Sequence, residues 1–386
     1  MEEKRNVPKL RFPGFTDSWE QRRLGELVDV RSGKDYKHLK SGPIPVYGTG
    51  GLITYVDDAL SKNEDAVGIG RKGTIDQPYK LYAPFWTVDT LFYAVPKAGS
   101  DIEFVLCCFQ RINWKAKDES TGLPSLSKRA IDDTQLLAPR SGEQSRIGAL
   151  FAKLDSLIAL HQRKLDHVKE LKKGLLQKMF PKEGANVPEL RFPGFTDPWE
   201  QRRLGELCTF AKGRGYGKTD ICDSGIPLIL YGRLYTQYQT RIEEVDTFAA
   251  EKDGALLSKG NEVIVPASGE TAEDIAVASS VRSSGIIFGG DLNVLIPEDA
   301  LDPDYVALGI TYGSAHTDLA KRAQGKSVVH VHNTDIAMTE LAYPCIDEQK
   351  AISAFVLKLD SLIALHQREL DHVKELKKGL LQQMFV

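Results

Sequence analysis

The sequence lacks the patterns that would mark a membrane protein or a zinc protein. None of its apolar runs approaches the roughly 18 residues that a membrane-spanning helix requires, and its start, MEEKRNVPK, has no apolar stretch typical of a secretory signal. Its five cysteines form no C-x-x-C motif, and adjacent Cys107 and Cys108 suit small buried residues. An odd, unpatterned set of cysteines is typical of reduced thiols, so we expect a cytoplasmic protein with no bound metal.

The common catalytic and nucleotide-binding motifs are also missing. Residues 68–73 (GIGRKG) match G-x-G-x-x-G, but TIDQPY follows, and its proline disfavours the helix that a dinucleotide site needs. Residues 213–219 (GRGYGKT) resemble a P-loop, but Lys212 stands where that motif has its first glycine. The chain has no Asn-Pro-Pro-aromatic methyltransferase motif, no H-E-x-x-H and no G-x-S-x-G. We therefore expect neither a catalytic site nor a cofactor.

Two long segments of the sequence each occur twice. Residues 154–180 (LDSLIALHQRKLDHVKELKKGLLQKMF) return as 359–385 with two changes, and residues 7–27 (VPKLRFPGFTDSWEQRRLGEL) return as 187–207, again with two changes. The segments between the copies look unrelated, so we interpret the chain as two half-units with a common frame and different inserts. We call the repeated segments 7–27 and 187–207 the clasps. The domains expected are a clasp with the first insert (1–142), a first helix (143–180), a repeated clasp with the second insert (181–345) and a second helix (346–386).

The repeated helix has a heptad pattern that predicts a coiled coil. From Ile147 to Met179 the seam residues recur in alternating steps of four and three, and the second copy does the same from Ile352 to Met384. We expect the two copies to pair with each other, because a single helix would leave its apolar stripe in water. The expected interface residues are Phe151, Leu154, Ile158, Leu165, Val168 and Leu175 with Val356, Leu359, Ile363, Leu370, Val373 and Leu380.

Polar residues interrupt this seam at His161 and Lys172 and at the same positions of the second copy. We interpret them as register-setting positions, or as lysines that reach out to water, rather than as ligand contacts. At about 1.5 Å per residue each helix would be about 55 Å long, which exceeds one turn of B-DNA at roughly 34–36 Å. Four further leucines are expected to widen the buried stripe: Leu150, Leu157, Leu171 and Leu176.

The clasp and the inserts carry their own structural signals. In RFPGFTDSWEQ a Pro-Gly turn lies among aromatic residues, and Asp17 with Glu20 resembles a capping box, which predicts one short helical turn. Within the inserts, AVGIGRKGTI, LFYAVP, NEVIVPAS and LNVLIP favour strands, whereas residues 102–112 and 302–323 favour helices. We therefore expect each insert to be a compact α+β domain.

The charge of the inserts argues against a uniformly basic surface. Residues 28–142 carry a net charge of +1 and residues 208–345 a net charge of −8, so bulk charge does not predict nucleic-acid binding. Basic residues nevertheless cluster locally, in GRKG, in PSLSKR and within residues 208–242 and 321–332. Such patches contact phosphates, and their arginine and lysine side chains can read base edges.

The order of these parts and the amino-acid sequences of the repeats resemble those of the specificity subunit of type I restriction-modification systems. The resemblance rests on RFPGFTDSWEQRRLGEL and its copy, and on the helical segments 143–180 and 348–385. Within the inserts, IPVYGTGGLITYVDD, GIGRKGTI, PFWTVDTLFY and STGLPSLSKRAI are similar to one type of target-recognition domain. IPLILYGRLYTQY, LLSKGNEVIVPASGET and GKSVVHVHNTDI are similar to another. Together these segments span essentially the whole chain.

The resemblance implies an α+β fold with two target-recognition domains joined by two long helices in an antiparallel coiled coil, a pseudo-two-fold internal repeat. Each domain would read one half of a split, asymmetric site on double-stranded DNA, and the helices would set the gap. The subunit would dock two modification (methyltransferase) subunits, and through them restriction (motor and endonuclease) subunits of a phage-defence system. S-adenosylmethionine, ATP and Mg²⁺ are then expected on the partner subunits and not on this chain.

Two other readings of the residues stay open. A coiled-coil scaffold or adaptor would bind no DNA, although it would not need two dissimilar Gly- and Tyr-rich domains with basic loops. A self-sufficient nuclease or methyltransferase would bind a catalytic metal or S-adenosylmethionine. The DNA-binding candidates are Tyr47, Arg71, Lys72, Trp86, Lys128 and Arg129 in the first insert and Arg214, Lys218, Arg233, Tyr235, Lys326 and His330 in the second.

Overall fold

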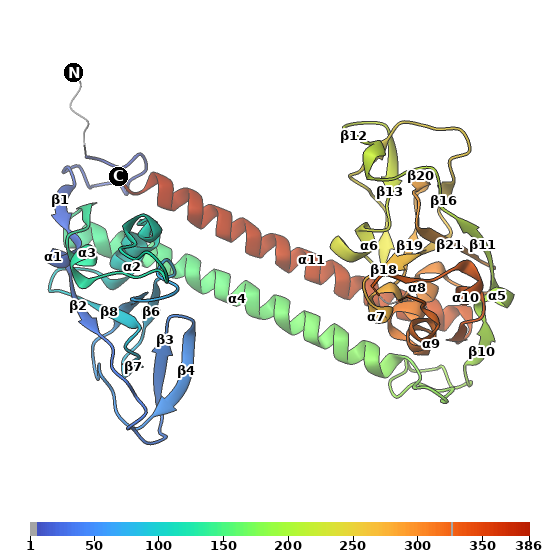
Figure 1. Cartoon of the computed structure of the whole chain (residues 1–386), viewed down its shortest axis with the longest axis horizontal. Helices are drawn as coiled ribbons and strands as arrows, with labels where there is room; N and C mark the ends of the chain where they lie inside the picture. The colour runs from blue at the N-terminus through green and yellow to red at the C-terminus, as the bar shows by residue number, and fades with distance from the viewer. Residues whose placement is uncertain (1–5, 326) are drawn as a thin grey trace. The chain divides into compact units, whose positions relative to one another are not determined.

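The computed structural model describes residues 6–325 and 327–386, which form two compact units. The first unit contains residues up to Gln162 together with Arg368–Val386, and the second contains Arg163–Gln367. Each unit therefore combines one globular domain with parts of both long helices, α4 (Ser141–Met179) and α11 (Ile346–Gln383), as Figure 1 shows.

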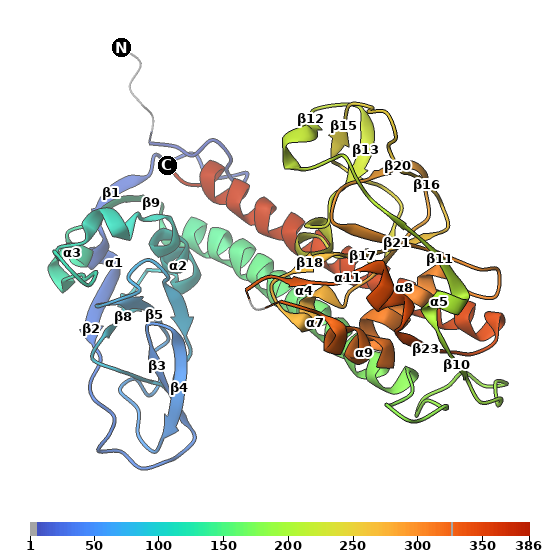
Figure 2. The same ribbon diagram turned by 45° about the vertical axis from the view of Figure 1, so that its right-hand side comes forward.

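The domain of the first unit consists of small sheets and short helices. Its strands are β1 (Glu20–Arg23), β2 (Val28–Ser32), β3 (Ile44–Gly48), β4 (Gly51–Val56), β5 (Ala66–Gly70), β6 (Tyr79–Leu81), β7 (Trp86–Thr87), β8 (Leu91–Pro96) and β9 (Gln135–Ala138). Its helices are α1 (Leu24–Leu27), α2 (Ile102–Arg111), the 3-10 turn η1 (Trp114–Lys117) and α3 (Lys128–Asp132). The main sheet has the order β2-β8-β5-β6, and a smaller sheet has the order β4-β3-β7. In Figures 1 and 2 the smaller sheet lies at the end of this unit away from β1 and α1.

The domain of the second unit is larger and is built in the same way. Its strands are β10 (Glu200–Arg203), β11 (Cys208–Lys212), β12 (Ile221–Cys222), β13 (Ile226–Ile229), β14 (Arg241–Ile242), β15 (Phe248–Ala249), β16 (Leu257–Lys259), β17 (Glu262–Pro266), β18 (Ser268–Gly269), β19 (Ser279–Val281), β20 (Ser284–Phe288), β21 (Leu292–Pro297), β22 (Val329–His330) and β23 (Glu340–Tyr343). Its helices are α5 (Leu204–Leu207), the 3-10 turn η2 (Lys218–Asp220), α6 (Arg233–Thr236), α7 (Ala272–Ile275), α8 (Pro303–Tyr312), α9 (Ser314–Arg322) and α10 (Asn333–Ala337). Its two main sheets have the orders β11-β21-β17-β19-β14 and β12-β15-β13-β20-β16.

The two domains share one topology although their inserts look unrelated in sequence. The order β2-β8-β5-β6 corresponds strand by strand to β11-β21-β17-β19. In both domains the strand after the clasp pairs antiparallel with a strand that ends in proline, with Val28 opposite Pro96 and Cys208 opposite Pro297. The parallel pair of β3 and β7 likewise corresponds to that of β13 and β20. The expected α+β class is confirmed for both inserts.

Most expected elements are confirmed, with two differences. The four expected strands are β5, β8, β17 and β21, and the helix expected over residues 102–112 is α2 (Ile102–Arg111). Residues 302–323 form two helices because the chain turns at Gly313, whose backbone (φ −89°, ψ −173°) is extended. The helical turn expected at Asp17 is wrong, since Glu20 begins strand β1 and the short helix starts at Leu24.

The structure bears on two expectations from the sequence, which concern membrane-spanning helices and the state of the cysteines. No helix within residues 6–325 and 327–386 offers an apolar stretch of the length that a membrane span needs. All five cysteines lie in this part of the chain as free thiols, and Cys107 and Cys108 are buried as expected. Burial raises the pKa of Cys108 to about 12, so its thiol stays neutral and packs as a small apolar side chain.

A buried arginine–glutamate pair fixes the clasp of each unit to the start of its long helix. The guanidinium of Arg11 donates two hydrogen bonds of 2.7 Å each to the carboxylate of Glu143, which is 2% exposed. Arg191 binds Glu348 through the same two bonds, again of 2.7 Å each. Such bidentate pairs fix orientation as well as distance.

The glutamine that follows each of these glutamates ties the insert to the helix. The side-chain amide of Gln144 donates to the carbonyl of Pro139 at 2.8 Å, and its oxygen accepts from the backbone N–H of Asp101 at 3.2 Å. In the second unit, Gln349 bonds in the same way to Pro344 at 2.8 Å and to Asp302 at 2.9 Å. Asp101 and Asp302 are the residues that cap helices α2 and α8. Each glutamine therefore holds the start of one helix of the insert through the backbone N–H of its capping residue.

An aromatic triad closes each domain against the carboxyl end of a long helix. In the first unit, Trp19 of the clasp and Phe104 of the insert meet Phe385 from the end of α11, with ring centres 5.3–6.0 Å apart. In the second unit the triad is Trp199, Tyr305 and Phe180, with ring centres 5.8–6.2 Å apart. Each triad thus combines a clasp, an insert and the helix of the other half of the chain.

Within each unit the two long helices pair in antiparallel fashion along the expected seam. In the first unit α4 meets α11 and the residues just after it in reverse order, from Phe151 beside Phe385 to His161 beside Glu369. All twelve expected interface residues are buried or half-buried. The stripe is narrower than expected, because Leu157 is 42% exposed and Leu171 is 44% exposed.

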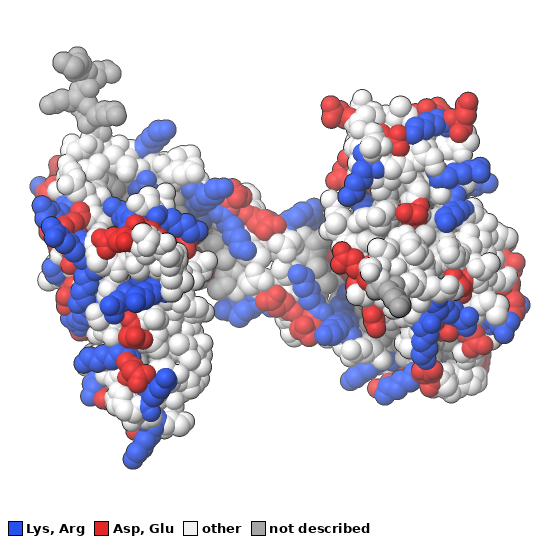
Figure 3. Space-filling model, viewed as in Figure 1, with Lys and Arg blue, Asp and Glu red and all other residues white. Residues whose placement is uncertain are grey.

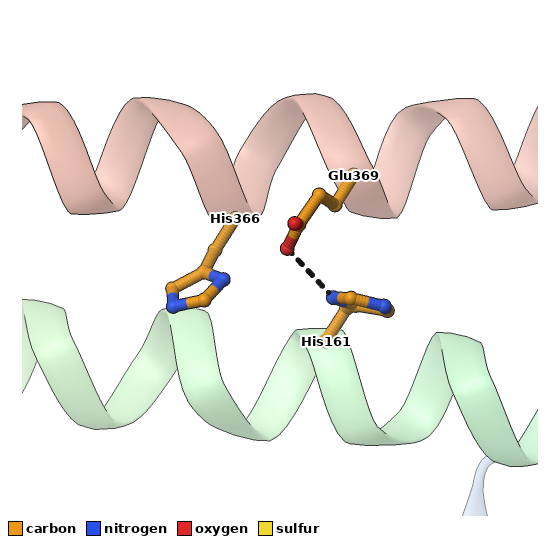
Figure 4. A group of neighbouring side chains, drawn as sticks. All are labelled: His161, His366 and Glu369. Carbon is orange, nitrogen blue, oxygen red and sulfur yellow. Dashed lines mark ion pairs between the residues drawn. The ribbon is translucent and has the colours of Figure 1, made fainter.

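The seam lysines bond to aspartates of the opposite helix. Nζ of Lys377 lies 2.6 Å from Asp155 in the first unit, and Nζ of Lys172 lies 2.5 Å from Asp360 in the second. These aspartates and lysines occupy matching positions of the two repeats. Nδ1 of His161 lies 3.1 Å from Glu369, and Figure 4 draws this pair as a dashed line between the two helices. Because part-buried polar pairs of this kind favour one alignment of two helices, they fit the register-setting role.

We expect Arg11→Ala to destabilise the first unit strongly. The substitution would leave the carboxylate of Glu143 buried without its partner, and breaking a buried pair in this way costs about 3–5 kcal/mol. The measurement is chemical denaturation followed by circular dichroism, with Arg191→Ala as the equivalent change in the second unit.

Two further variants separate this role from a general effect of charge. Arg22→Ala removes an exposed pair with Glu20, and its cost should stay below about 1 kcal/mol. The double variant Arg11→Met/Glu143→Leu should recover most of the stability that Arg11→Ala loses. Equal stability of the Arg11→Ala and Arg22→Ala variants would contradict the role given to the clasp pair.

Candidate nucleic-acid interface

In the first domain, Arg71 and Lys72 stand in a tight turn that follows strand β5. A β-carbon at Gly70 would lie 1.9 Å from the carbonyl oxygen of Thr74, so only glycine fits where the strand ends. Gly73 then continues the turn with a φ of +88°, a conformation that favours glycine. The two glycines therefore fix the place of the two cations between them.

The backbone of Arg71 is held on both sides while its side chain is exposed. Its N–H donates to the carbonyl of Thr90 at 2.8 Å, and its own carbonyl accepts from the N–H of Leu126 at 2.9 Å. The guanidinium lies 5.8 Å from the ring centre of Phe92 and 3.4 Å from the carbonyl oxygen of Asp89. Contacts of this length are weak, so the side chain can exchange them for a phosphate or a base edge.

Arg71, Lys72 and Lys128 line one open groove of about 400 Å³. Lys72 forms an isolated backbone bridge with Ser125, which holds the turn after β5 against the loop before α3. The other residues that line the groove are Ser32, Phe92, Glu119, Ser125, Leu126 and Ser127. Three of the expected cations thus converge from two loops, an arrangement that suits a phosphate backbone.

The other candidates of the first domain differ in what they can offer a ligand. Arg129 lies outside this groove, with its exposed guanidinium 3.3 Å from Asp133. Tyr47 is half-buried on β3, and its ring centre lies 6.1 Å from that of Tyr79. Trp86 is 5% exposed, and its indole N–H donates to the carbonyl of Lys34 at 2.8 Å. Because Trp86 packs in the core with its donor satisfied, we remove it from the candidate contacts.

In the second domain, Arg233 is turned inward. Its side chain is 13% exposed, and the guanidinium donates to Asp246 at 2.6 Å and to the side-chain oxygen of Gln239 at 3.4 Å. The hydrogen bond from Arg233 lowers the pKa of Asp246, which keeps that carboxylate charged. We expected Arg233 to contact DNA from a strand end, but in the structure it begins helix α6 and braces the loop around it.

Tyr235 and His330 lie together at strand β18. The hydroxyl of Tyr235 donates to the carbonyl of Ser268 at 2.8 Å, and burial raises the pKa of this phenol, so it stays protonated. The hydroxyl of Ser268 lies 3.2 Å from Nδ1 of His330, whose side chain is exposed. Lys326, the remaining candidate of this turn, lies outside the described residues.

Arg214 and Lys218 are exposed in the glycine-rich segment that follows strand β11. Arg214 lines an open groove of about 580 Å³ together with Lys212 and Asp291. Lys218 begins the 3-10 turn η2 and does not line this groove among the described residues. This groove therefore brings two cations, Lys212 and Arg214, together beside one carboxylate.

Sequence reasoning missed several exposed residues of the two recognition domains that are further candidates for this interface. Lys34 follows β2 as Arg214 follows β11, and the signal for both is a shared spacing in LVDVRSGKDY (27–36) and LCTFAKGRGY (207–216). Leu52, Ile53 and Tyr55 on the edge strand β4 are 50–51% exposed. Nothing in the sequence distinguishes these three from core residues, because an apolar run in a strand predicts burial.

The electrostatic character of the interface is local. On the face drawn in Figure 3, acidic and basic side chains are interspersed over both units, in keeping with the small net charge of −3. Even in the groove of the first domain, Glu119 lies among the cations. A ligand is therefore attracted by particular loops and not by a whole face.

Comparisons with known sequences identify one family. A model of the family described as type I restriction modification DNA specificity domain matches residues 16–170 and 196–375. The specificity subunit of the type I restriction enzyme MjaVIII from Methanocaldococcus jannaschii is 18% identical over 278 residues. That match covers 69% of this chain and 65% of the relative's length.

Comparisons with solved structures identify the fold. The S subunit of a type I restriction-modification system from M. genitalium has a TM-score of 0.70 and 14% identity, over 98% of this chain and 99% of that chain. A chain from a structural description of complex assembly and conformational transition of the type I R-M system has a TM-score of 0.52 and 16% identity, over 98% and 99%. At these identities the likeness shows the fold of two repeated domains with a coiled coil.

We expect Arg71→Ala to weaken the binding of duplex DNA that carries the recognition sequence. An arginine that reads guanine contributes about 1–3 kcal/mol of discrimination, so affinity should fall roughly tenfold for the cognate duplex and much less for a scrambled one. The measurement is fluorescence anisotropy with labelled duplexes, performed on the chain together with its modification partners.

Matched variants make this result specific. Lys62→Ala removes an exposed cation that pairs with Asp58 outside the groove, and it should leave both affinities unchanged. Arg233→Ala should lower thermal stability without selective loss for the cognate duplex, because the side chain of Arg233 is 13% exposed and its guanidinium is held by Asp246 of the same domain. Unchanged binding by the Arg71→Ala variant would exclude Arg71 from the interface.

Proposed function

Because this chain belongs to the specificity-subunit family of type I restriction-modification systems, we propose that it selects the DNA site for such a complex without catalysing a reaction itself. Each domain reads one half of a bipartite, asymmetric sequence, and the coiled coil sets the gap between the halves. DNA enters as the ligand of the two grooves at Arg71 and Arg214. As a reader of cellular and incoming DNA, the subunit works in the cytoplasm.

One observation carries this proposal. Two domains of the same topology are held in the same frame, yet side chains at equivalent backbone positions differ, as at the bridges Lys72–Ser125 and Ser268–His330. A protein that read a symmetric site would need identical side chains at equivalent positions of the two domains, whereas an asymmetric site requires different ones. The repeated frame with varied inserts is what a bipartite, asymmetric site demands.

The surface of the long helices supports the docking of two identical modification subunits. The first unit exposes three leucines, Leu157, Leu160 and Leu376, and the second exposes Leu171, Leu362 and Leu365, all at 37–45%. These are the same three positions of the repeat. In the first unit two of them lie on α4 and one on α11, and in the second unit one lies on α4 and two on α11. Exposed apolar side chains favour protein partners, and matching sets favour two copies of one partner. S-adenosylmethionine, ATP and Mg²⁺ then bind the modification and restriction subunits.

The proposal predicts that each insert controls one half of the recognition sequence. Replacing residues 28–142 by the first insert of another family member should change one half of the methylated sequence and leave the other half and the gap intact. The measurement is single-molecule sequencing of modified bases in cells that express the chain with its modification subunit.

The reciprocal exchange of residues 208–345 is the matched control, and it should alter only the other half. A change in both halves after either exchange, or in neither, would contradict the division of reading between the domains. A chain that assembles with its partner and supports no sequence-specific methylation would favour the scaffold reading.

The proposal also predicts that the coiled coil determines the gap. Deleting one heptad from both helices shortens each by roughly 10 Å, which corresponds to about three base pairs. The gap should shorten while both half-sequences are kept, as read from the same methylation maps. Deleting the heptad from one helix only should disturb the pairing of Lys172 with Asp360 and abolish methylation. An unchanged gap after the double deletion would show that the length of the helices does not determine the distance between the half-sequences.

A further inference from the structure

Backbone hydrogen bonds identify equivalent positions in the two recognition domains. In the first domain, Arg71 donates to the carbonyl of Thr90 at 2.8 Å and accepts from the N–H of Leu126 at 2.9 Å. In the second, Ala267 donates to the carbonyl of Asp291 at 2.8 Å and accepts from the N–H of Val331 at 3.1 Å. Both residues follow corresponding strands, β5 and β17. Arg71 and Ala267 therefore occupy the same place in the fold.

The next residue along the chain forms a backbone bridge in both domains. Lys72 pairs with Ser125 in the first domain, and Ser268 pairs with His330 in the second. The equivalence thus extends to two pairs of side chains that project from matching backbone. We call them the matched bridges, Lys72–Ser125 and Ser268–His330.

A third pair of equivalent positions keeps its charge. The N–H of Gly33 donates to the carbonyl of Leu91 at 3.1 Å, and that of Gly213 donates to the carbonyl of Leu292 at 2.9 Å. The residue that follows is a cation in both domains, Lys34 and Arg214, and both are exposed. A position that stays cationic in two domains that read different sequences suits the phosphate backbone, which is the same everywhere.

The matched bridges behave in the opposite way. Their backbone is the same, but a lysine with a serine in one domain is replaced by a serine with a histidine in the other. Two domains that read different half-sequences on one scaffold must differ at the positions that touch bases. We infer that the matched bridges are base-reading positions, with Lys72–Ser125 reading the first half-sequence and Ser268–His330 the second. This inference rests on the proposed function.

The chemistry of each bridge indicates the kind of base it reads. The ammonium of Lys72 only donates hydrogen bonds, so it suits the paired acceptors O6 and N7 of guanine. Nδ1 of His330 lies 3.2 Å from the hydroxyl of Ser268. When that hydroxyl donates to Nδ1, the neutral ring carries its proton on Nε2 and presents a single donor. A single donor suits N7 of a purine in the major groove.

The Ser268–His330 bridge is also held in place from behind. The hydroxyl of Tyr235 donates to the carbonyl of Ser268 at 2.8 Å. The backbone of His330 exchanges two hydrogen bonds with Gln324, of 2.7 and 3.0 Å. These bonds leave the imidazole as the exposed part of the bridge. A rigid backbone under an exposed donor is what reading a base requires, because the discrimination depends on fixed geometry.

The experiment uses the chain assembled with its modification subunit. Methylated sequences are mapped in cells for the wild type and for Lys72→Ala, His330→Ala and His330→Gln, and thermal melting of the purified complexes verifies folding. Lys72→Ala should relax one position of the first half only, and the His330 variants one position of the second half only. Methylation of sites that carry a wrong base at that position should rise roughly tenfold, relative to methylation of sites that carry the correct base.

Two further variants sharpen the test. Lys34→Ala and Arg214→Ala should keep the methylated sequence, weaken binding to all duplexes alike and reduce the salt dependence by about one phosphate contact. The double variant Ser268→Lys/His330→Ser places the first domain's pair on the second domain's backbone, and it should shift that position of the second half toward guanine.

The outcomes separate this inference from the function on which it rests. A wild-type complex that methylates no bipartite sequence would overturn the proposed function. A bipartite sequence that stays unchanged in the folded Lys72 and His330 variants would overturn the matched bridges alone. The bridges would also be excluded as base readers if these variants weakened binding to cognate and scrambled duplexes equally, because that is the signature of a phosphate contact.

Discussion

The bidentate bond between a clasp arginine and a buried glutamate is the interaction on which the rest of this molecule depends. Arg11 and Arg191 lie in the repeated clasps, whereas Glu143 and Glu348 stand at the starts of the long helices. The two partners of each pair therefore belong to the frame, and the insert lies between them in the sequence. The frame can therefore keep the same contacts while the insert between them varies, as it does between the two halves of this chain. The glutamine beside each glutamate then holds the insert through backbone groups, which every sequence provides.

The two inserts have no visible similarity, yet they adopt one topology, and each also contributes an aromatic side chain, Phe104 or Tyr305, to the contact with the frame. The sequence predicted the strands β5, β8, β17 and β21, because each is a short apolar run between turn residues. It also predicted the seam of the coiled coil, because a heptad repeat specifies burial directly. It could not predict that the sheet orders correspond, since pairing between strands depends on partners far along the chain. The turn expected at Asp17 failed for a related reason: Glu20 pairs with Ala138 in a strand, and that long-range pairing prevails over a local capping signal.

The candidate site could be predicted only where local geometry decides it. Arg71 and Lys72 stand between two glycines, and the sequence shows that arrangement as clearly as the structure does. Arg233 has equally suggestive neighbours, but Asp246 and Gln239 occupy its guanidinium, and no pattern in the sequence connects these residues. The burial of Trp86 could not be seen in the sequence either, because the carbonyl of Lys34 that accepts from its indole N–H is 52 residues away. The matched bridges could not be predicted from either domain alone, because they are identified only by comparing the backbone hydrogen bonds of the two domains.

The acidic second insert raises the question of how it could accept DNA, and its core gives part of the answer. Several of its acids act inside the domain. Glu262 is 4% exposed and accepts the backbone N–H groups of Lys259 and Gly260, and Asp302 caps helix α8. Asp304 is 1% exposed and bonds to Arg241. A net charge of −8 therefore overstates the acidity of the surface that a ligand meets. Charges farther than about 8 Å from a phosphate are largely screened at physiological ionic strength. The cations beside the groove, Lys212 and Arg214, thus act on a phosphate more strongly than distant carboxylates do, so the local arrangement of charge outweighs the sum.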